Sequence, residues 1–339
     1  MVGKIVELHE DEAFARSPGS SRDILAGEDD LARGRRMTPV TTLRSVVLSG
    51  QACPGAAAGG TRVSVGVVAV VDGVCMGFTY FASSGECRRM APTIDVPSAG
   101  FRFMPGVFQY SCGVVAMPGF RIERTRFAEP VPMAAGWQRI AAHLDAIGRP
   151  REAFCACELR SPEPFSEAGF LDFNQAYAAV LAEWGILRNG ENPVARSNVC
   201  PEIAPPAEPG FHAFSYTVPE QGAPLSFIVA GSGESEEGHA NYRDYTVAPG
   251  DTSPAGVLAK ARWVLAEMER RMAALGGSWA GTTGVNIYTV FDIHPFLAEE
   301  LVARGAARHG ATWQFCRPPV AGLDYEMDCR RVAMERVLF

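Results

Sequence analysis

The stretches YSCG…FAEPVP (residues 110–132) and SFIVAGSGE (residues 226–234) introduce the same series of features twice. Each is followed by an amphipathic run that ends at glycine, over 137–147 in the first copy and 257–275 in the second. A strand-like run, a second helical run and closing strands come after it in both copies. A repeat unit of roughly one hundred residues is much longer than the repeats of solenoid proteins, so the pattern predicts a duplicated domain.

The first copy has the hydrophobic spacing of a helix followed by that of a strand. Ile140, Leu144 and Ile147 are four and three residues apart, which places them on one helix face, and Gly148 is a typical residue for the end of that helix. Residues 154–159 alternate as a half-buried strand does. Residues 172–184 then predict a second helix.

The second copy repeats this order. Its first helix ends at Gly276-Gly277, and the run 283–291 predicts the next strand. Residues 295–304 predict another helix, before two closing strands. We therefore expect an α+β fold of two tandem domains, 107–218 and 219–339, each a mixed β-sheet with two helices on one face.

Residues 1–106 have a different character, and we treat them as a separate N-terminal extension. Residues 1–40 are polar with little periodicity and predict a loosely held leader. Two β-rich runs within 44–82 flank Asp72-Gly73, which is a typical hairpin turn. We expect residues 83–106 to form a loop.

Composition limits the functions that are open to the chain. It has 339 residues, is 47% hydrophobic and carries a formal net charge of −7. An acidic chain without a Lys/Arg-rich block is not typical of nucleic-acid binding, and the apolar run 63–71 is too short to span a membrane. Residues 1–36 contain no apolar stretch of the kind found in signal peptides, and the nine cysteines are scattered, so we expect a cytoplasmic protein with reduced thiols.

Several short motifs, in the same order in both copies, resemble the RidA/YjgF family of small trimeric proteins that hydrolyse reactive enamines and imines. The matching residues are Tyr110-Ser111-Cys112-Gly113 and Gly231-Ser232-Gly233 at the first strand, Phe170, Phe173-Asn174 and Tyr177 on the second helix, Pro193-Val194-Ala195-Arg196-Ser197, and Tyr325-Glu326-Met327-Asp328 on the last strand. The resemblance covers residues 107–339. It implies tandem RidA-like domains, a small-molecule carboxylate substrate, no cofactor, and a homo-oligomer based on threefold symmetry.

The chain departs from the family pattern in an informative way. In the family, an arginine that binds the substrate carboxylate lies fifteen positions before the acidic residue of the last strand. The first copy keeps Arg196 but has Phe211 at the acidic position, and the second keeps Glu326 but has Ala311 at the arginine position. Either Arg196 and Glu326 converge in sites between unlike domains, or one copy has a working site and the other has none.

The resemblance assigns roles to these residues, and each has a plainer alternative. Arg196 would bind a carboxylate through two parallel hydrogen bonds, or else form an interdomain salt bridge. Glu326, if buried, would have a raised pKa and transfer protons, or else lie in water on an edge strand. Other candidate substrate-binding residues are Ser197, Asn174, Ser111, Gly113, Ser232 and Gly233, although turn geometry alone also favours glycines.

His294 is a second candidate catalytic residue, because it precedes a predicted helix in a region where the family places site residues. Cys155 and Cys157 lack a second pair at metal-ligand spacing and are interpreted as core residues, as are Cys200 and Cys316. No metal site is predicted.

We therefore predict a cofactor-independent hydrolytic deaminase that acts on an enamine/imine carboxylate. With its two lobes and its length, this chain resembles the 2-aminomuconate and 2-amino-5-chloromuconate deaminases of aromatic catabolism. The alternatives are a chorismatase-like hydrolase that releases pyruvate from chorismate, and a non-catalytic protein that binds small carboxylates. Ammonia release distinguishes the deaminase from the chorismatase-like hydrolase.

Overall fold

A computed structural model describes residues 64–71, 74–83, 86–87, 93–239 and 241–339. The chain forms two compact units, residues 1–90 and residues 91–339. In the first unit, β1 (Ser64–Val71) and β2 (Val74–Ser83) pair antiparallel with Val71 opposite Val74, and β3 (Glu86–Cys87) pairs with β2. The predicted pair of strands is thus confirmed, whereas Asp72-Gly73 and the predicted leader lie outside the described residues.

The second unit is an α+β fold with two mixed sheets. One sheet has six strands in the order β14-β9-β8-β10-β7-β16, and the other has seven in the order β13-β12-β15-β11-β6-β5-β4. The strand bounds are β4 Ile94–Val96, β5 Phe101–Met104, β6 Gly113–Ala116, β7 Phe120–Pro132, β8 Phe154–Arg160, β9 Ala195–Pro201, β10 Gly210–Pro219, β11 Phe227–Gly233, β12 Gly284–Tyr288, β13 Thr312–Gln314, β14 Cys316–Arg317, β15 Glu326–Arg331 and β16 Met334–Leu338.

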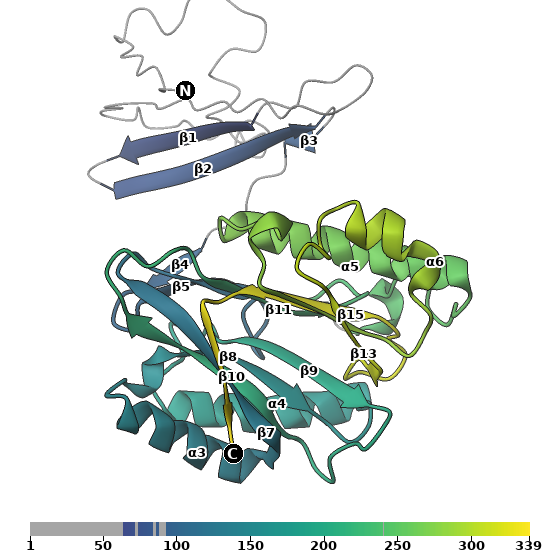
Figure 1. The fold of residues 1–339 in the computed structure, drawn as a ribbon, viewed down its shortest axis with the longest axis horizontal. Coiled ribbons are helices and arrows are strands. Elements are labelled where there is room, and N and C mark those ends of the chain that lie inside the picture. Colours follow the sequence, from purple (N-terminus) through teal and green to yellow (C-terminus); the bar gives the residue numbers. More distant parts are fainter. Residues whose placement is uncertain (1–63, 72–73, 84–85, 88–92, 240) are drawn as a thin grey trace, which may run out of the picture. The chain divides into compact units, whose positions relative to one another are not determined.

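The helices lie outside the two sheets (Figure 1), with α3 and α4 along the six-stranded sheet and α5 and α6 along the other. Their bounds are α3 Met133–Ala146, α4 Glu167–Glu183, α5 Pro254–Ala274 and α6 His294–Phe296, which continues as a π-helical segment, Leu297–Val302. Short 3-10 turns lie at Arg151–Ala153, Arg243–Tyr245 and Trp279–Gly281. Ser166 and Ser253 are the N-cap residues of α4 and α5, and the side chain of each accepts a hydrogen bond from the backbone N–H three residues later.

The two halves of this unit share one topology. The series β7-α3-β8-α4-β9-β10 gives the strand order β9-β8-β10-β7, and the series β11-α5-β12-α6-β13-β15 gives β13-β12-β15-β11. In both halves, the two strands joined by the second helix are parallel (β8 with β9, β12 with β13). The other neighbouring strands of these two series pair antiparallel. The repeat of elements in the sequence therefore corresponds to a repeat of strand order.

Each sheet also contains strands from elsewhere in the chain. β16 pairs in parallel with β7, and β14 pairs with β9, so both join the six-stranded sheet from the second half. β6 pairs with β11 and brings β5 and β4 into the seven-stranded sheet. The two halves are thus joined by strand pairing as well as by side-chain packing.

Two expectations from the sequence differ from the structure. The segment predicted as a loop, 83–106, contains β4 and β5, because Phe101 and Phe103 are buried against the core and supply the alternation of a strand. The motif at 110–113 leads into β6 of the seven-stranded sheet, whereas the strand equivalent to β11 is β7. Residues 93–116 thus belong to the same sheet as the second half.

The strands β9 and β15 are buried along almost their whole length, since each has a helix layer on one side and the other sheet on the other. Polar residues on these strands are therefore held in the interior. Within the described part of the chain, no helix has the length and hydrophobicity needed to cross a membrane.

Candidate active site

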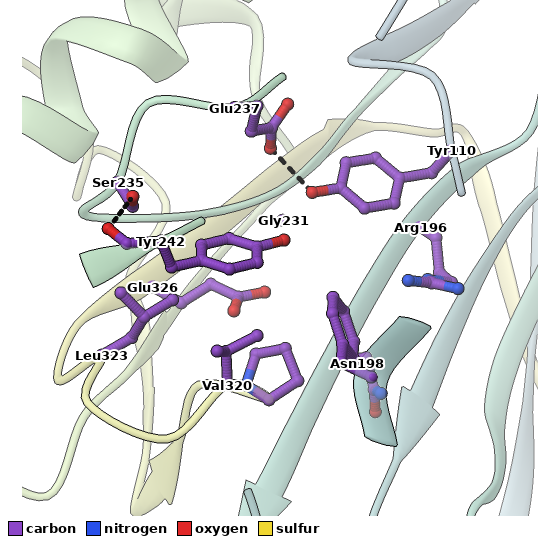
Figure 2. A pocket seen from close by; sticks show the side chains of 13 residues that line it. Tyr110, Arg196, Asn198, Gly231, Ser235, Glu237, Tyr242, Val320, Leu323 and Glu326 are labelled. Carbon is purple, nitrogen blue, oxygen red and sulfur yellow. Dashed lines mark hydrogen bonds between the residues drawn. The ribbon is translucent and has the colours of Figure 1, made fainter. Parts of the chain in front are cut away.

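A pocket lies where the six-stranded sheet faces the seven-stranded one (Figure 2). Its space, including the part open to solvent, is about 420 Å³. Residues of β9, β11 and β15 form its floor, and Ser235, Glu237 and Tyr242, which follow β11 in the sequence, line one side. The lining residues are Tyr110, Phe170, Arg196, Asn198, Gly231, Gly233, Ser235, Glu237, Tyr242, Pro319, Val320, Leu323 and Glu326.

Arg196 supplies the positive charge of this pocket. It is the second residue of β9 and is only 2% exposed, yet it has no ion pair or hydrogen bond among the described residues, and its buried Nη1 has no partner. Aromatic rings surround the guanidinium instead, with its carbon 4.8 to 5.9 Å from the ring centres of Tyr110, Phe170, Phe173 and Tyr177. A buried arginine without an anionic partner is expected to receive one from a ligand.

Glu326 lies across the pocket from Arg196 (Figure 2). It is the first residue of β15, opposite Gly233 of β11 and Tyr288 of β12, and is 4% exposed. A Cβ atom on Gly231 would collide with Glu326 Oε1, so the absence of a side chain there makes room for the carboxyl group. Burial raises the pKa of Glu326 well above its ordinary value, and the nearby Asp328 and Glu237 raise this pKa further. The surroundings of this carboxyl therefore favour its protonated form.

The segment 234–242 is fixed to the rest of the pocket through Glu237. The Tyr110 hydroxyl donates to Glu237 over 2.8 Å, and Arg271 of α5 forms an ion pair with it at 3.2 Å. The Ser235 hydroxyl donates to the carbonyl oxygen of Tyr242. Burial raises the pKa of Tyr242 to about 12, so its hydroxyl remains a donor. Two tyrosines and a carboxylate thereby form the wall next to Arg196 and Glu326.

A second buried carboxylate, Glu234, holds the chain that enters β15. It accepts hydrogen bonds from the backbone N–H groups of Asp324 and Tyr325, at 2.6 and 3.0 Å, and Lys260 lies 3.9 Å away. Burial raises the pKa of Glu234 to about 7, although those hydrogen bonds and Lys260 act in the opposite direction. Because Glu326 follows directly, this contact positions the catalytic candidate.

Ser197 faces away from this pocket, contrary to its predicted role in substrate binding. Its hydroxyl donates to Asp328 Oδ2 over 2.6 Å, and Asn286 and Tyr288 donate to the same carboxylate at 2.8 and 2.7 Å. Neighbouring residues of a strand point to opposite faces, so Ser197 cannot share the direction of Arg196. It belongs to a polar cluster between the two sheets.

Of the other predicted binding residues, Gly233 lines the pocket, while Ser111, Gly113, Ser232 and Asn174 do not. The Ser111 hydroxyl donates to the carbonyl of Pro193, which joins the segment before β6 to the start of β9. Gly113 is packed so closely on the β11 backbone that a Cβ atom would lie 2.8 Å from the Ile228 oxygen. Ser232 lies within 3.4 Å of Arg271, and Asn174 is buried in α4 without a partner for its amide.

His294 is not brought to the pocket. Its side chain is 71% exposed at the start of α6, where its ring nitrogen bonds to Asp292 at 2.6 Å and the ring packs edge-on against Trp313. His294 therefore does not line the pocket that contains Glu326.

The cysteines in residues 93–339 are buried as predicted. Burial raises the pKa of Cys157 and of Cys200 to about 12, so neither is a thiolate at neutral pH. Within the described part of the chain, no three His, Cys, Asp or Glu side chains are placed to hold a metal ion together.

Four polar residues of the pocket belong to none of the motifs in the sequence: Asn198, Ser235, Glu237 and Tyr242. A signal existed for Asn198, because it lies two residues after Arg196 and alternation places both on one face of a strand. No comparable signal exists for the others, since their positions depend on how the segment after β11 folds back over the sheet.

Taken together, the pocket has a buried arginine without an anionic partner among the described residues and, opposite it, a buried carboxyl group whose pKa is raised. Such an arrangement suits an anionic ligand and acid–base chemistry. The family model described as 2-aminomuconate deaminase CnbZ matches residues 93–336. A 2-amino-5-chloromuconate deaminase from Comamonas testosteroni is 49% identical over 251 residues, which are 74% of this chain and the whole of that relative. The chain belongs to the 2-aminomuconate deaminase family, which confirms the prediction of a deaminase-class enzyme that acts on C–N bonds.

Proposed function

We propose that this chain hydrolyses 2-aminomuconate or a close 2-amino dicarboxylate and releases ammonia. The observation that carries the proposal is that one pocket contains Arg196, which is buried without a partner for its Nη1 among the described residues, and Glu326, a buried carboxyl group with a raised pKa. The names of the family and of the relative from Comamonas testosteroni support the choice of substrate.

Arg196 binds a substrate carboxylate in this proposal. Its planar guanidinium presents parallel N–H groups that match the two carboxylate oxygens. The aromatic rings around it exclude water, which strengthens the ion pair that forms on binding.

Glu326 transfers the protons. The protonated carboxyl gives its proton to the enamine carbon that does not carry the nitrogen. The nitrogen lone pair then forms the C=N bond of an iminium ion. The resulting carboxylate takes a proton from water as the water oxygen attacks the iminium carbon and forms a carbinolamine. Glu326 then returns this proton to the nitrogen, the C–N bond breaks, and the oxygen forms the ketone as its proton passes back to Glu326. One water is consumed, one ammonia leaves, and the acid is restored.

The two halves of residues 91–339 are, in this proposal, tandem RidA-like domains that divide one functional pair between them. Their common strand order supports this interpretation. We further propose a homo-oligomer based on threefold symmetry in the cytoplasm. A groove next to the pocket has the exposed hydrophobic side chains Phe108 and Leu171 on its wall, which a neighbouring subunit would cover.

The proposal is tested by incubating the purified chain with freshly prepared 2-aminomuconate and, separately, with chorismate. Enzymatic detection of ammonia in the first reaction and no pyruvate in the second is the expected result. Pyruvate from chorismate, without ammonia from 2-aminomuconate, would instead support the chorismatase-like alternative.

A further inference from the structure

We propose that Asn198 binds the second carboxylate of a dicarboxylate substrate, in the pocket where Arg196 binds the first. This proposal rests on the proposed function and extends it to the recognition of the substrate.

The two residues are placed for such a pair of contacts by the geometry of β9. Arg196 and Asn198 are two positions apart on one strand, so both point to the same face, and both line the pocket. The rise of a strand separates their Cα atoms by roughly 6.6 Å. Two anchors on one strand thus suit an extended molecule with an acidic group at each end.

Both residues have a donor that lacks an acceptor. Among the described residues, seven buried side-chain nitrogen or oxygen atoms have no hydrogen-bond partner, and the two from residues that line this pocket are Arg196 Nη1 and Asn198 Nδ2. Asn198 is 3% exposed, so its amide lies in the interior of the protein. Buried polar groups are nearly always paired in folded proteins, and an unpaired donor next to a pocket is therefore expected to bond to a ligand.

The amide of Asn198 is also oriented. Its Oδ1 accepts a hydrogen bond from the Ser161 hydroxyl at 3.0 Å, which leaves the NH₂ group as the free end. Among the described residues, neither pocket carboxyl group accepts from that donor, and Glu237 already accepts a hydrogen bond from Tyr110 and forms an ion pair with Arg271. The β9 side of the pocket thus offers donors alone, which suits carboxylate oxygens.

The test compares two stable ligands that differ only at one end. Muconate is a six-carbon diene with a carboxylate at each end, and sorbate is the same chain with a methyl group in place of one carboxylate. Their dissociation constants are measured by calorimetry for the full-length wild type, Asn198→Leu and Ser161→Ala. Leucine keeps the size of the side chain without a donor, while Ser161→Ala removes only the contact that orients the amide.

The wild type should bind muconate more tightly than sorbate. Asn198→Leu should weaken muconate binding by about tenfold to a hundredfold, as expected for one hydrogen bond to a charged group, and leave sorbate binding unchanged. Ser161→Ala should retain a preference for muconate. Equal losses for both ligands, or no loss for either, would overturn the role of Asn198. Because binding is measured without turnover, that result is separable from a failure of ammonia release, which would concern the proposed function.

Discussion

Glu326 Oε1 occupies the space that a Cβ atom on Gly231 would fill. The two residues come from neighbouring strands, β11 and β15, and this fit lets a carboxyl group lie inside the protein with its acidic end in the pocket. The same burial raises the pKa of this carboxyl group. The absence of a side chain at Gly231 thus allows the proposed acid to lie in the interior, where burial raises its pKa.

Gly231→Ala should displace the Glu326 carboxyl and lower kcat/KM by about a hundredfold, the effect of a misplacement of about 1 Å. Steady-state ammonia release measures it. Gly148→Ala is the control, because Gly148 has a positive φ but open space around it, so alanine there costs stability without reaching the pocket. Equal activity in the two variants would show that the fit between Gly231 and Glu326 has no catalytic importance.

Arg196→Lys should lower kcat/KM, with a loss of transition-state stabilisation of roughly 1.5–3 kcal/mol. Lysine keeps the charge but loses the paired N–H groups. The melting temperature should change little, since Arg196 has no ion-pair partner among the described residues. A variant with normal kinetics and a much lower melting temperature would identify Arg196 as a structural residue.

The raised pKa of Glu326 predicts how stability depends on pH. In the unfolded chain this group loses its proton near pH 4.3, while the folded protein keeps it to a much higher pH. Above pH 4.3 the folded state thus binds the extra proton, and the free energy of unfolding falls as pH rises through the folded pKa.

Glu326→Gln removes this contribution and leaves those of Glu234 and Asp328, whose pKa values burial also raises. Urea unfolding at pH 5, 6, 7 and 8 should therefore show the variant gaining stability over the wild type as the pH rises towards the folded pKa of Glu326. Parallel stability curves for the two proteins would contradict a raised pKa of Glu326.

A trimer in solution is the simplest assembly for the proposed RidA-like domains. Light scattering on the full-length chain should give three times the chain mass at micromolar concentration, and Leu171→Glu should weaken the assembly if the groove is covered by a neighbour. A stable monomer would instead indicate that one chain completes its own ring.

The main helices and strands of residues 107–339 could be predicted from local patterns, because each has a hydrophobic face with a clear period. Ile140 and Leu144 are buried as their spacing requires, whereas Ile147, just after α3, is 38% exposed. Cys155 and Cys157 are both buried in β8. The division of Arg196 and Glu326 between the two copies allows two interpretations, one of which is that the two side chains share a site. Both residues line one pocket in the structure.

Contacts made by irregular segments could not be predicted. Glu237 and Tyr242 reach the pocket because the chain after β11 folds over it, and nothing in their local sequence encodes that path. His294 looked suitable by position, but its exposure depends on which helix layer its turn belongs to. Ser197 matches a family motif, yet the direction of its side chain follows from the alternation of β9.

Glu326 is the group that transfers protons in the proposed reaction. The direct test is kcat for ammonia release from 2-aminomuconate by the wild type and by Glu326→Gln, which keeps the shape of the side chain and removes its titrating proton. We predict a decrease in kcat of about 10²- to 10⁴-fold. A Gln variant that releases ammonia at the rate of the wild type would contradict the mechanism.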